Sequence, residues 1–320
     1  MRAGRTLVLA GVIAVSLATT LRPAVATDEP KKQYWATSLS GSVDEHILMG
    51  LYAAVAQGAV GWLDIDPTNP IPRLTTGINL IFYHVGGNCY VGDDCDRFPS
   101  SAPTGDRWGD SERVVDLEDP DVRKIVVGDL LAMVRRADQI APAGAIIGVH
   151  LDNVHRLGAE AIAEVFNDFL QAVEAARQRG TISRSRQVGY VAKNNPSAFR
   201  EALDQGLLNA LPLYQINENA KLNKEGALDE ESQRAQQIGR RYCVPVFLKT
   251  FGTDVAYTVE ENGDKRDVYV SEAMTRRMAE MPSISGAAWS VDEGNYHPTL
   301  FAEGSPVARE PRASGPCRNE

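Results

Sequence analysis

The stretch Gly148-Val149-His150-Leu151-Asp152-Asn153-Val154 decides the predicted fold. Small and apolar residues lead into an aspartate, the chain must then turn, and an amphipathic helix pattern follows almost at once. A buried parallel strand delivers a carboxylate to the mouth of an α/β fold in this way. A second apolar run, at 211–216, leads to Glu218 in the same manner.

Short β-branched runs alternate with longer helical patterns along the whole chain. This alternation favours a parallel sheet, and eight repeats predict an α/β fold of the (β/α)8 TIM-barrel type in a single domain. The predicted strands are 34–39, 60–65, 79–85, 145–151, 187–192, 211–216, 244–249 and 286–290. The predicted helices are 119–139, 160–178, 198–205, 230–241 and 271–281. A doubly wound open sheet is the alternative, but no glycine-rich dinucleotide or phosphate loop follows a strand.

The two ends of the chain are predicted to lie outside the barrel. Arg2 and Arg5 precede an uncharged apolar run, and Ala24-Val25-Ala26 forms a small-x-small cleavage site. Residues 1–26 are therefore predicted to be a secretory signal peptide, with an uncleaved membrane anchor as the alternative. Residues 27–301 are assigned to the barrel, and residues 302–320 to a polar C-terminal tail. The expected location is extracellular or periplasmic, without membrane attachment after cleavage.

The charge and the cysteines narrow the function. The net charge is −9 at pH 7, and without the arginines of the leader it becomes more negative. No basic patch is visible, so nucleic acid is not an expected partner. The four cysteines allow three disulfide pairings in an oxidising compartment. The pairing of Cys89 with Cys95 and of Cys243 with Cys317 would staple the long polar loop at 86–118 and tie down the tail.

Polar side chains gather where the predicted strands end. In a barrel these ends meet at one mouth, where reactive groups lie. Two acids at the ends of neighbouring strands, Asp152 and Glu218, are the minimum equipment for hydrolysing a glycosidic bond. The strand-end residues are Asp64, Asp66, Tyr83, His84, His150, Asp152, Lys193, Asn194, Asn217, Glu218, Lys249, Asp292 and Glu293.

Several blocks of sequence occur in an order that resembles the endo-α-1,4-polygalactosaminidase family of glycoside hydrolases, together with its relatives of TIM-barrel form. The resemblance covers about residues 34 to 250. The blocks are Trp35 with Leu39-Ser40-Gly41, Asp64-Ile65-Asp66, Cys95-Asp96-Arg97-Phe98-Pro99, Ser111-Glu112-Arg113-Val114-Val115-Asp116-Leu117, the stretch 148–154, Val191-Ala192-Lys193-Asn194, and Asn217-Glu218.

The resemblance implies a secreted or surface barrel that cuts a galactosamine-containing polymer by acid/base chemistry. It implies that Asp152 is the nucleophile and Glu218 the general acid/base, whereas the residues alone indicate the pair without its roles. We expect a monomer with a polysaccharide substrate and no cofactor. The expected substrate-binding residues are Asp66, Tyr83, His150, Asn153, Lys193, Asn217, Lys249 and Trp289. Lys193 is also expected to hold Asp152 ionised, and Asn153 to fix the turn. Trp108 and Tyr214 are further candidates for stacking on a sugar.

The sequence departs from the family pattern at three places. His150-Leu151 stands where the family usually has glutamate and proline, Asn219-Ala220 replaces a cysteine-bearing continuation, and Lys249 replaces an acid. From Lys249 we expect a substrate less cationic than a galactosamine polymer. Two alternatives remain open: a barrel that binds polysaccharide without cutting it, and a metal-dependent hydrolase or deacetylase that uses His150, Asp152, His155 and Glu218 as ligands.

Overall fold

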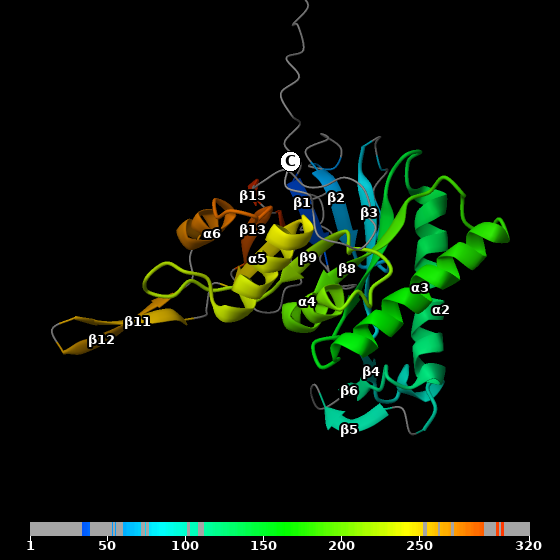
Figure 1. Cartoon of the computed structure of the whole chain (residues 1–320), viewed down its shortest axis with the longest axis horizontal. Coiled ribbons are helices and arrows are strands. Elements are labelled where there is room, and N and C mark those ends of the chain that lie inside the picture. Colours follow the sequence, from blue (N-terminus) through cyan, green and yellow to red (C-terminus); the bar gives the residue numbers. More distant parts are fainter. Residues whose placement is uncertain are drawn as a thin grey trace, which may run out of the picture. The chain divides into compact units, whose positions relative to one another are not determined.

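The structure is a computed structural model of the chain, and it has a mixed α/β architecture (Figure 1). It describes residues 34–38, 53, 55, 60–71, 74, 77–100, 103–107, 112–251, 255–261, 263–269, 272–290, 299–300 and 302–303. The predicted signal peptide, Trp108, Asp292, Glu293 and Cys317 lie outside these residues. None of the described helices is both long enough and apolar enough to cross a membrane.

A parallel sheet forms the centre of the structure, and its strands pair in the order in which they occur in the chain. Each predicted strand is present, within three residues of its expected limits. The strands are β1 (Tyr34–Ser38), β2 (Val60–Ile65), β3 (Asn79–Val85), β7 (Ile147–Asp152), β8 (Val188–Lys193), β9 (Tyr214–Asn217), β10 (Val246–Phe251) and β13 (Gly286–Ser290). A doubly wound sheet reverses its strand order at a switch point. The described order has no such reversal, so this alternative was wrong.

The two ends of the parallel run are covered by short antiparallel strands. β14 (Thr299–Leu300) pairs with β1, and β15 (Ala302–Glu303) pairs with β13. Residues 302 and 303, predicted to open the tail, instead form backbone hydrogen-bonded pairs with the sheet. The parallel sheet agrees with the predicted fold class, whereas a complete (β/α)8 barrel stays a prediction.

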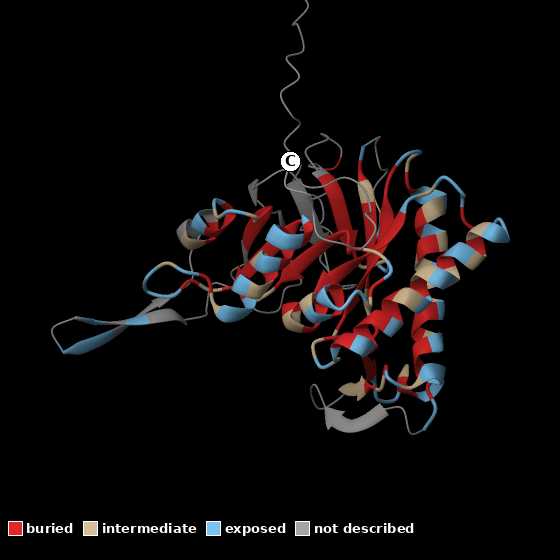
Figure 2. Ribbon diagram, viewed as in Figure 1, coloured by how far each residue is buried: buried red, intermediate tan, exposed pale blue. Residues whose placement is uncertain are grey.

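Helices follow the strands and pack on the sheet through their apolar faces (Figure 2). Several begin at residues that cap them: Asp119 accepts a hydrogen bond from the backbone of α2, Asn195 from α4 and Asp229 from α5. Such caps satisfy amide groups that have no partner within the helix. The helices are α2 (Pro120–Ile140), α3 (Ala159–Gln178), α4 (Pro196–Asp204), α5 (Glu230–Tyr242) and α6 (Glu272–Ala279).

The concave side of the sheet carries a separate apolar cluster. Trp62 and Phe247 each contact Tyr214 edge to face, with ring centroids 5.7 and 5.5 Å away. Trp62 on β2 and Tyr214 on β9 are distant along the sheet order, so the sheet must curl to bring them into contact. Gly148 and Gly189 face each other across β7 and β8, and the space that their missing side chains leave is filled by Leu213.

An insertion follows β3 where the sequence suggested a long polar loop. It forms a three-stranded sheet of β4 (Asn88–Tyr90), β5 (Pro103–Arg107) and β6 (Glu112–Val115), with a short 3-10 helix at Cys95–Arg97. The loop prediction failed because these strands are short and pair with one another, which leaves little apolar periodicity. Arg97 ties the insertion to α2 by an ion pair of 2.6 Å with Asp129.

The cysteine prediction is met in part. Cys89 and Cys95 form a disulfide that closes the first turn of the insertion. Cys243 is also disulfide-bonded, while its predicted partner lies outside the described residues. A second hairpin, β11 (Val255–Glu261) with β12 (Asp264–Tyr269), was not predicted.

The close approach at Gly148 generates a stability prediction. A Cβ at this position would lie 2.8 Å from the carbonyl oxygen of Gly189 and 2.8 Å from a methyl group of Leu213. Gly148→Ala should therefore lower the free energy of unfolding by roughly 1–3 kcal/mol. Urea denaturation would measure it. Gly128→Ala, in α2 with no atom within 4 Å, should instead stabilise by roughly 0.5–1 kcal/mol. Equal effects of the two substitutions would contradict the packing described for Gly148.

Candidate active site

Three charged side chains meet at the C-terminal ends of three neighbouring strands. Asp152 is the last residue of β7, Lys193 is the last residue of β8, and Glu218 directly follows β9. The strands are adjacent in the sheet, so the three side chains arrive at the same edge. This is the edge at which sequence reasoning placed the two acids.

Lys193 joins the two acids. Its Nζ atom lies 2.6 Å from Oδ2 of Asp152 and 3.1 Å from Oε2 of Glu218. Lys193 is only 5 % exposed. Burial by itself lowers the pKa of Lys193, but the charges of Asp152 and Glu218 and the hydrogen bonds to both raise it above its ordinary value. Lys193 therefore stays protonated and neutralises part of the charge of the two carboxylates.

Asp152 is held by further donors. The hydroxyl group of Tyr83 donates to Oδ2, and the backbone amide of Asn153 donates to Oδ1 at 2.7 Å. Burial by itself raises the pKa of Asp152, but the charges of Lys193 and His150 and the hydrogen bonds from Lys193 and Tyr83 lower it to about 2. Burial and the neighbouring Asp152 raise the pKa of Tyr83, so its hydroxyl stays a donor.

The turn after Asp152 has the form expected from the sequence. Asn153 has a left-handed backbone with φ of 63°, a conformation that Asn adopts more readily than most residues. Gly87, from the start of the insertion, donates its amide to the carbonyl oxygen of Asp152 at 3.2 Å. A side chain at Gly87 would meet the carbonyl oxygen of Asn153 at 2.2 Å, so the insertion and this turn fit closely.

Glu218 borders an open polar cavity of about 380 Å³. Its amide donates to the side-chain oxygen of Asn194 at 2.9 Å, and in the described part of the chain its buried Oε1 has no hydrogen-bond partner. Asp229 also borders the cavity, but its carboxylate caps α5 and accepts from the amide of Lys221 at 2.6 Å. The lining residues are His155, Asn194, Asn195, Asn217, Glu218, Asn219, Asp229 and Glu231. Sequence reasoning assigned no role to Asn194, Asp229 or Glu231.

Two predicted binding residues make local contacts instead of joining the central group. Asp66 accepts hydrogen bonds from the amide and the hydroxyl group of Thr68, at 2.8 and 2.5 Å. Asn217 borders the cavity but donates from its side chain to Ser232 at 3.1 Å. The indole of Trp289 lies outside the described residues, although its backbone belongs to β13.

Lys249 lies on β10 with its side chain inside the sheet. It is 0 % exposed, so it does not face a ligand at the surface. Burial lowers the pKa of Lys249 to about 8, and the charge of Lys193 acts in the same direction, whereas the charges of Glu218, Asp64 and Asp152 oppose it. The expectation of a less cationic substrate rested on Lys249 facing that substrate, and the burial of its side chain removes this basis.

His150 and Tyr214 are likewise completely buried. Nδ1 of His150 lies 2.6 Å from Oδ2 of Asp64, and the hydroxyl group of Tyr214 donates to the same oxygen at 2.8 Å. Neither side chain can touch a sugar in this structure, so stacking by Tyr214 is excluded here. Sequence reasoning noted Asp64 as a strand-end residue but missed these contacts, which join strands far apart in the chain.

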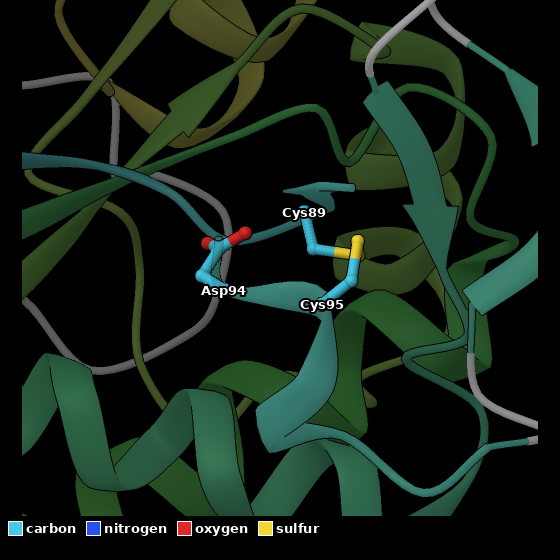
Figure 3. A group of neighbouring side chains, drawn as sticks. All are labelled: Cys89, Asp94 and Cys95. Atoms are coloured by element: carbon cyan, nitrogen blue, oxygen red, sulfur yellow. A yellow bond between two sulfur atoms is a disulfide. The ribbon is translucent and has the colours of Figure 1, made fainter. Parts of the chain in front are cut away.

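The geometry does not support the metal alternative. His150, Asp152, His155 and Glu218 do not bring three ligand atoms within 4.8 Å of one another. Among the described residues, such a group occurs at Cys89, Asp94 and Cys95 (Figure 3). The two sulfur atoms of this group are bonded to each other, so neither is a thiolate that could bind a metal.

No protein-family model matches the chain, and no curated protein matches it. Among solved structures it is similar to Ega3 of Aspergillus fumigatus in complex with galactosamine, with 15 % identity, a TM-score of 0.47, and coverage of 88 % of this chain and 95 % of that one. It is also similar to the glycoside hydrolase domain of PelA from Pseudomonas aeruginosa, with 12 % identity, a TM-score of 0.48, and coverage of 80 % and 94 %.

The low pKa of Asp152 generates a prediction for stability. A carboxylate whose pKa is lower in the folded state stabilises the fold above its unfolded pKa near 3.8, and this contribution is lost as the pH falls towards 2. Between pH 5 and pH 2 the wild type should lose roughly 2 kcal/mol more than Asp152→Asn does. Chemical denaturation at a series of pH values would measure this difference, because the other carboxylates are common to both proteins. Parallel pH curves would show that Asp152 is not held ionised.

Proposed function

We propose that the chain is a glycoside hydrolase that cleaves an amino-sugar-containing exopolysaccharide with two carboxylates. The observation that carries the proposal is the contact of both Asp152 and Glu218 with Nζ of Lys193 beside an open polar cavity. Glu218 lines this cavity and Asp152 is joined to it through Lys193, and two carboxyl groups held this close match the requirement of the reaction. The amino-sugar substrate and the family type come from the sequence resemblance.

The environments of the two acids support different roles. Asp152 accepts three hydrogen bonds, and its low pKa keeps it negatively charged. A permanently charged carboxylate is suited to attack the anomeric carbon. Glu218 contacts Lys193 through one oxygen, and its other oxygen accepts no hydrogen bond from the described residues. We therefore assign Asp152 as nucleophile and Glu218 as the general acid/base that protonates the leaving oxygen and then activates water.

The spacing of the acids favours retention of configuration. Because both contact the same nitrogen atom, their two nearest oxygens can lie no farther apart than the distances of 2.6 and 3.1 Å laid end to end. This limit is close to the roughly 5–5.5 Å typical of retaining enzymes and below the roughly 6.5–9.5 Å of inverting ones. In the proposed reaction, Asp152 forms a covalent glycosyl intermediate, which water then releases.

The cavity beside Glu218 is the proposed place for one sugar unit. Its volume of about 380 Å³ falls within the range of small-ligand sites. The side-chain amides of Asn194, Asn195 and Asn219 can each donate to and accept from sugar hydroxyl groups. Among the described residues that line the cavity there is no lysine or arginine, so an ammonium group on the substrate would meet no positive side chain of this lining. We propose that the enzyme acts after export, in keeping with the predicted leader and the Cys89–Cys95 disulfide.

Reducing-end release tests the proposal. Purified protein should cleave an α-1,4-linked galactosamine polymer, and Asp152→Asn and Glu218→Gln should each lower kcat by at least about 100-fold. Glu160→Gln, on the exposed first turn of α3, is the matched control and should retain full activity. Activity that survives both site substitutions would refute the two-carboxylate mechanism. Binding of the polymer without any cleavage would instead favour the alternative of a non-catalytic polysaccharide-binding barrel.

The assigned roles can be separated with a second substrate. A galactosaminide with a dinitrophenyl leaving group needs no protonation of that group to depart. Glu218→Gln should therefore form the glycosyl intermediate from it at nearly the wild-type rate, whereas Asp152→Asn should remain inactive. The initial burst of dinitrophenolate would measure this step. The reverse pattern would exchange the roles of the two acids.

A further inference from the structure

A second polar side chain lies beneath Asp152 on the same strand. Side chains two residues apart share one face of a strand, so His150 faces the concave side of the sheet one step deeper than Asp152. Its Nδ1 atom lies 2.6 Å from Oδ2 of Asp64, which belongs to β2, beyond β3. Tyr214, from β9, donates to the same oxygen at 2.8 Å. Donors from two sides thus hold one buried carboxylate.

This buried group is poorly explained as a source of stability. His150, Asp64 and Tyr214 are each 0 % exposed. A buried ion pair often contributes no more than apolar side chains of the same size would. In addition, Nε2 of His150 and Oδ1 of Asp64 are buried without a hydrogen-bond partner among the described residues, and such unpaired atoms cost free energy. The location of the pair directly under Asp152 therefore suggests a role in the site above it.

His150 reaches that site through Tyr83. The two rings meet edge to face, with centroids 5.2 Å apart and planes at 87°. The hydroxyl group of Tyr83 donates to Asp152, and Nζ of Lys193 lies 5.3 Å from the centre of the Tyr83 ring. The ring of Tyr83 is therefore fixed on two sides. The charge of His150 also follows that of Lys193 among the charges that lower the pKa of Asp152.

We infer that His150, held on Asp64, is a positioning residue that fixes the ring of Tyr83 and with it the hydrogen bond that Tyr83 donates to Asp152. The effect of His150 on the reaction rests on the proposed function, whereas its effect on Asp152 does not. The ionisable groups around His150 come from the parallel strands β2, β3, β7, β8, β9 and β10 or directly follow them. They are Asp64, Tyr83, Asp152, Lys193, Tyr214, Glu218 and Lys249.

The direct test follows the ionisation of Asp152 in the full chain. Protein labelled with 13C at the aspartate carboxyl carbons is titrated by NMR, and Asp152→Asn identifies the signal. In His150→Phe, which keeps a ring against Tyr83 but removes the nitrogen donor and the charge, the midpoint of Asp152 should rise by about 0.5–1 pH unit. His150→Asn keeps a donor for Asp64 and should give a smaller rise.

A second histidine–aspartate pair provides the matched control. His84 follows Tyr83 on β3, and its Nε2 atom lies 3.6 Å from Oδ2 of Asp129 on α2. Burial by itself raises the pKa of Asp129, but the neighbouring His84 and the charge of Arg97 lower it. His84→Phe should raise the midpoint of Asp129 and leave that of Asp152 unchanged. If His150→Phe moves Asp152 no more than His84→Phe does, the inference is overturned.

Two further measurements keep the outcomes distinct. Should His150→Phe fail to fold because Asp64 is left as a buried unpaired charge, the double variant Asp64→Asn/His150→Phe removes that charge and should show the same rise. The acid limb of the pH profile of kcat/KM should move to higher pH by the same amount as the NMR midpoint. An inactive wild type with a shifted midpoint would refute the proposed function alone, whereas normal hydrolysis with an unshifted midpoint would refute the positioning role alone.

Discussion

The candidate site depends on one interaction, the contact of Lys193 with both Asp152 and Glu218. Two carboxylates so close together, each only about a tenth exposed at the side chain, would repel each other strongly in surroundings of low dielectric constant. The ammonium group between them offsets this repulsion, and its raised pKa ensures that it carries the charge. The same contact brings the two acids within the distance that our proposed reaction requires. Lys193 thus connects the stability of the site with its chemistry.

The parallel sheet explains why these groups meet. Successive inward-facing positions change from apolar to polar along each strand, as in Trp62 followed by Asp64 on β2 and Val191 followed by Lys193 on β8. The apolar layer closes the concave side of the sheet, a middle layer of His150, Asp64 and Tyr83 lies above it, and the acids stand at the edge. The insertion after β3 contacts the turn at Asn153 through Gly87. Each layer restricts the positions open to the layer above.

Much of this arrangement was predictable from local pattern. Apart from His150, the strands that end at Asp152 and Lys193 consist of apolar residues and glycine before those ends, and the apolar periodicity of α3 is unambiguous. The parallel sheet, the meeting of the two acids and the contact of Lys193 with Asp152 were therefore predictable, whereas the contact of Lys193 with Glu218 was not predicted. Contacts between distant strands were not predictable, because nothing local in the sequence indicates that Asp64 and Tyr214 share one oxygen atom. Burial was misjudged for the same reason: Lys249 and His150 were predicted near strand ends, yet β10 and β7 continue beyond them and both side chains are buried. The small sheet after β3 escaped notice because its strands are short and polar.

The central claim is that Asp152 and Glu218 stand close enough, with Asp152 charged, for a covalent intermediate. The stereochemistry of the first product tests this most directly. When the protein acts on an α-linked galactosamine oligomer, 1H NMR can follow the new anomeric proton before the sugar equilibrates. The account predicts that the α-anomer appears first and the β-anomer only later, by mutarotation. Initial release of the β-anomer would show that water attacks directly, and the close pair of acids joined by Lys193 could then not be the reacting arrangement.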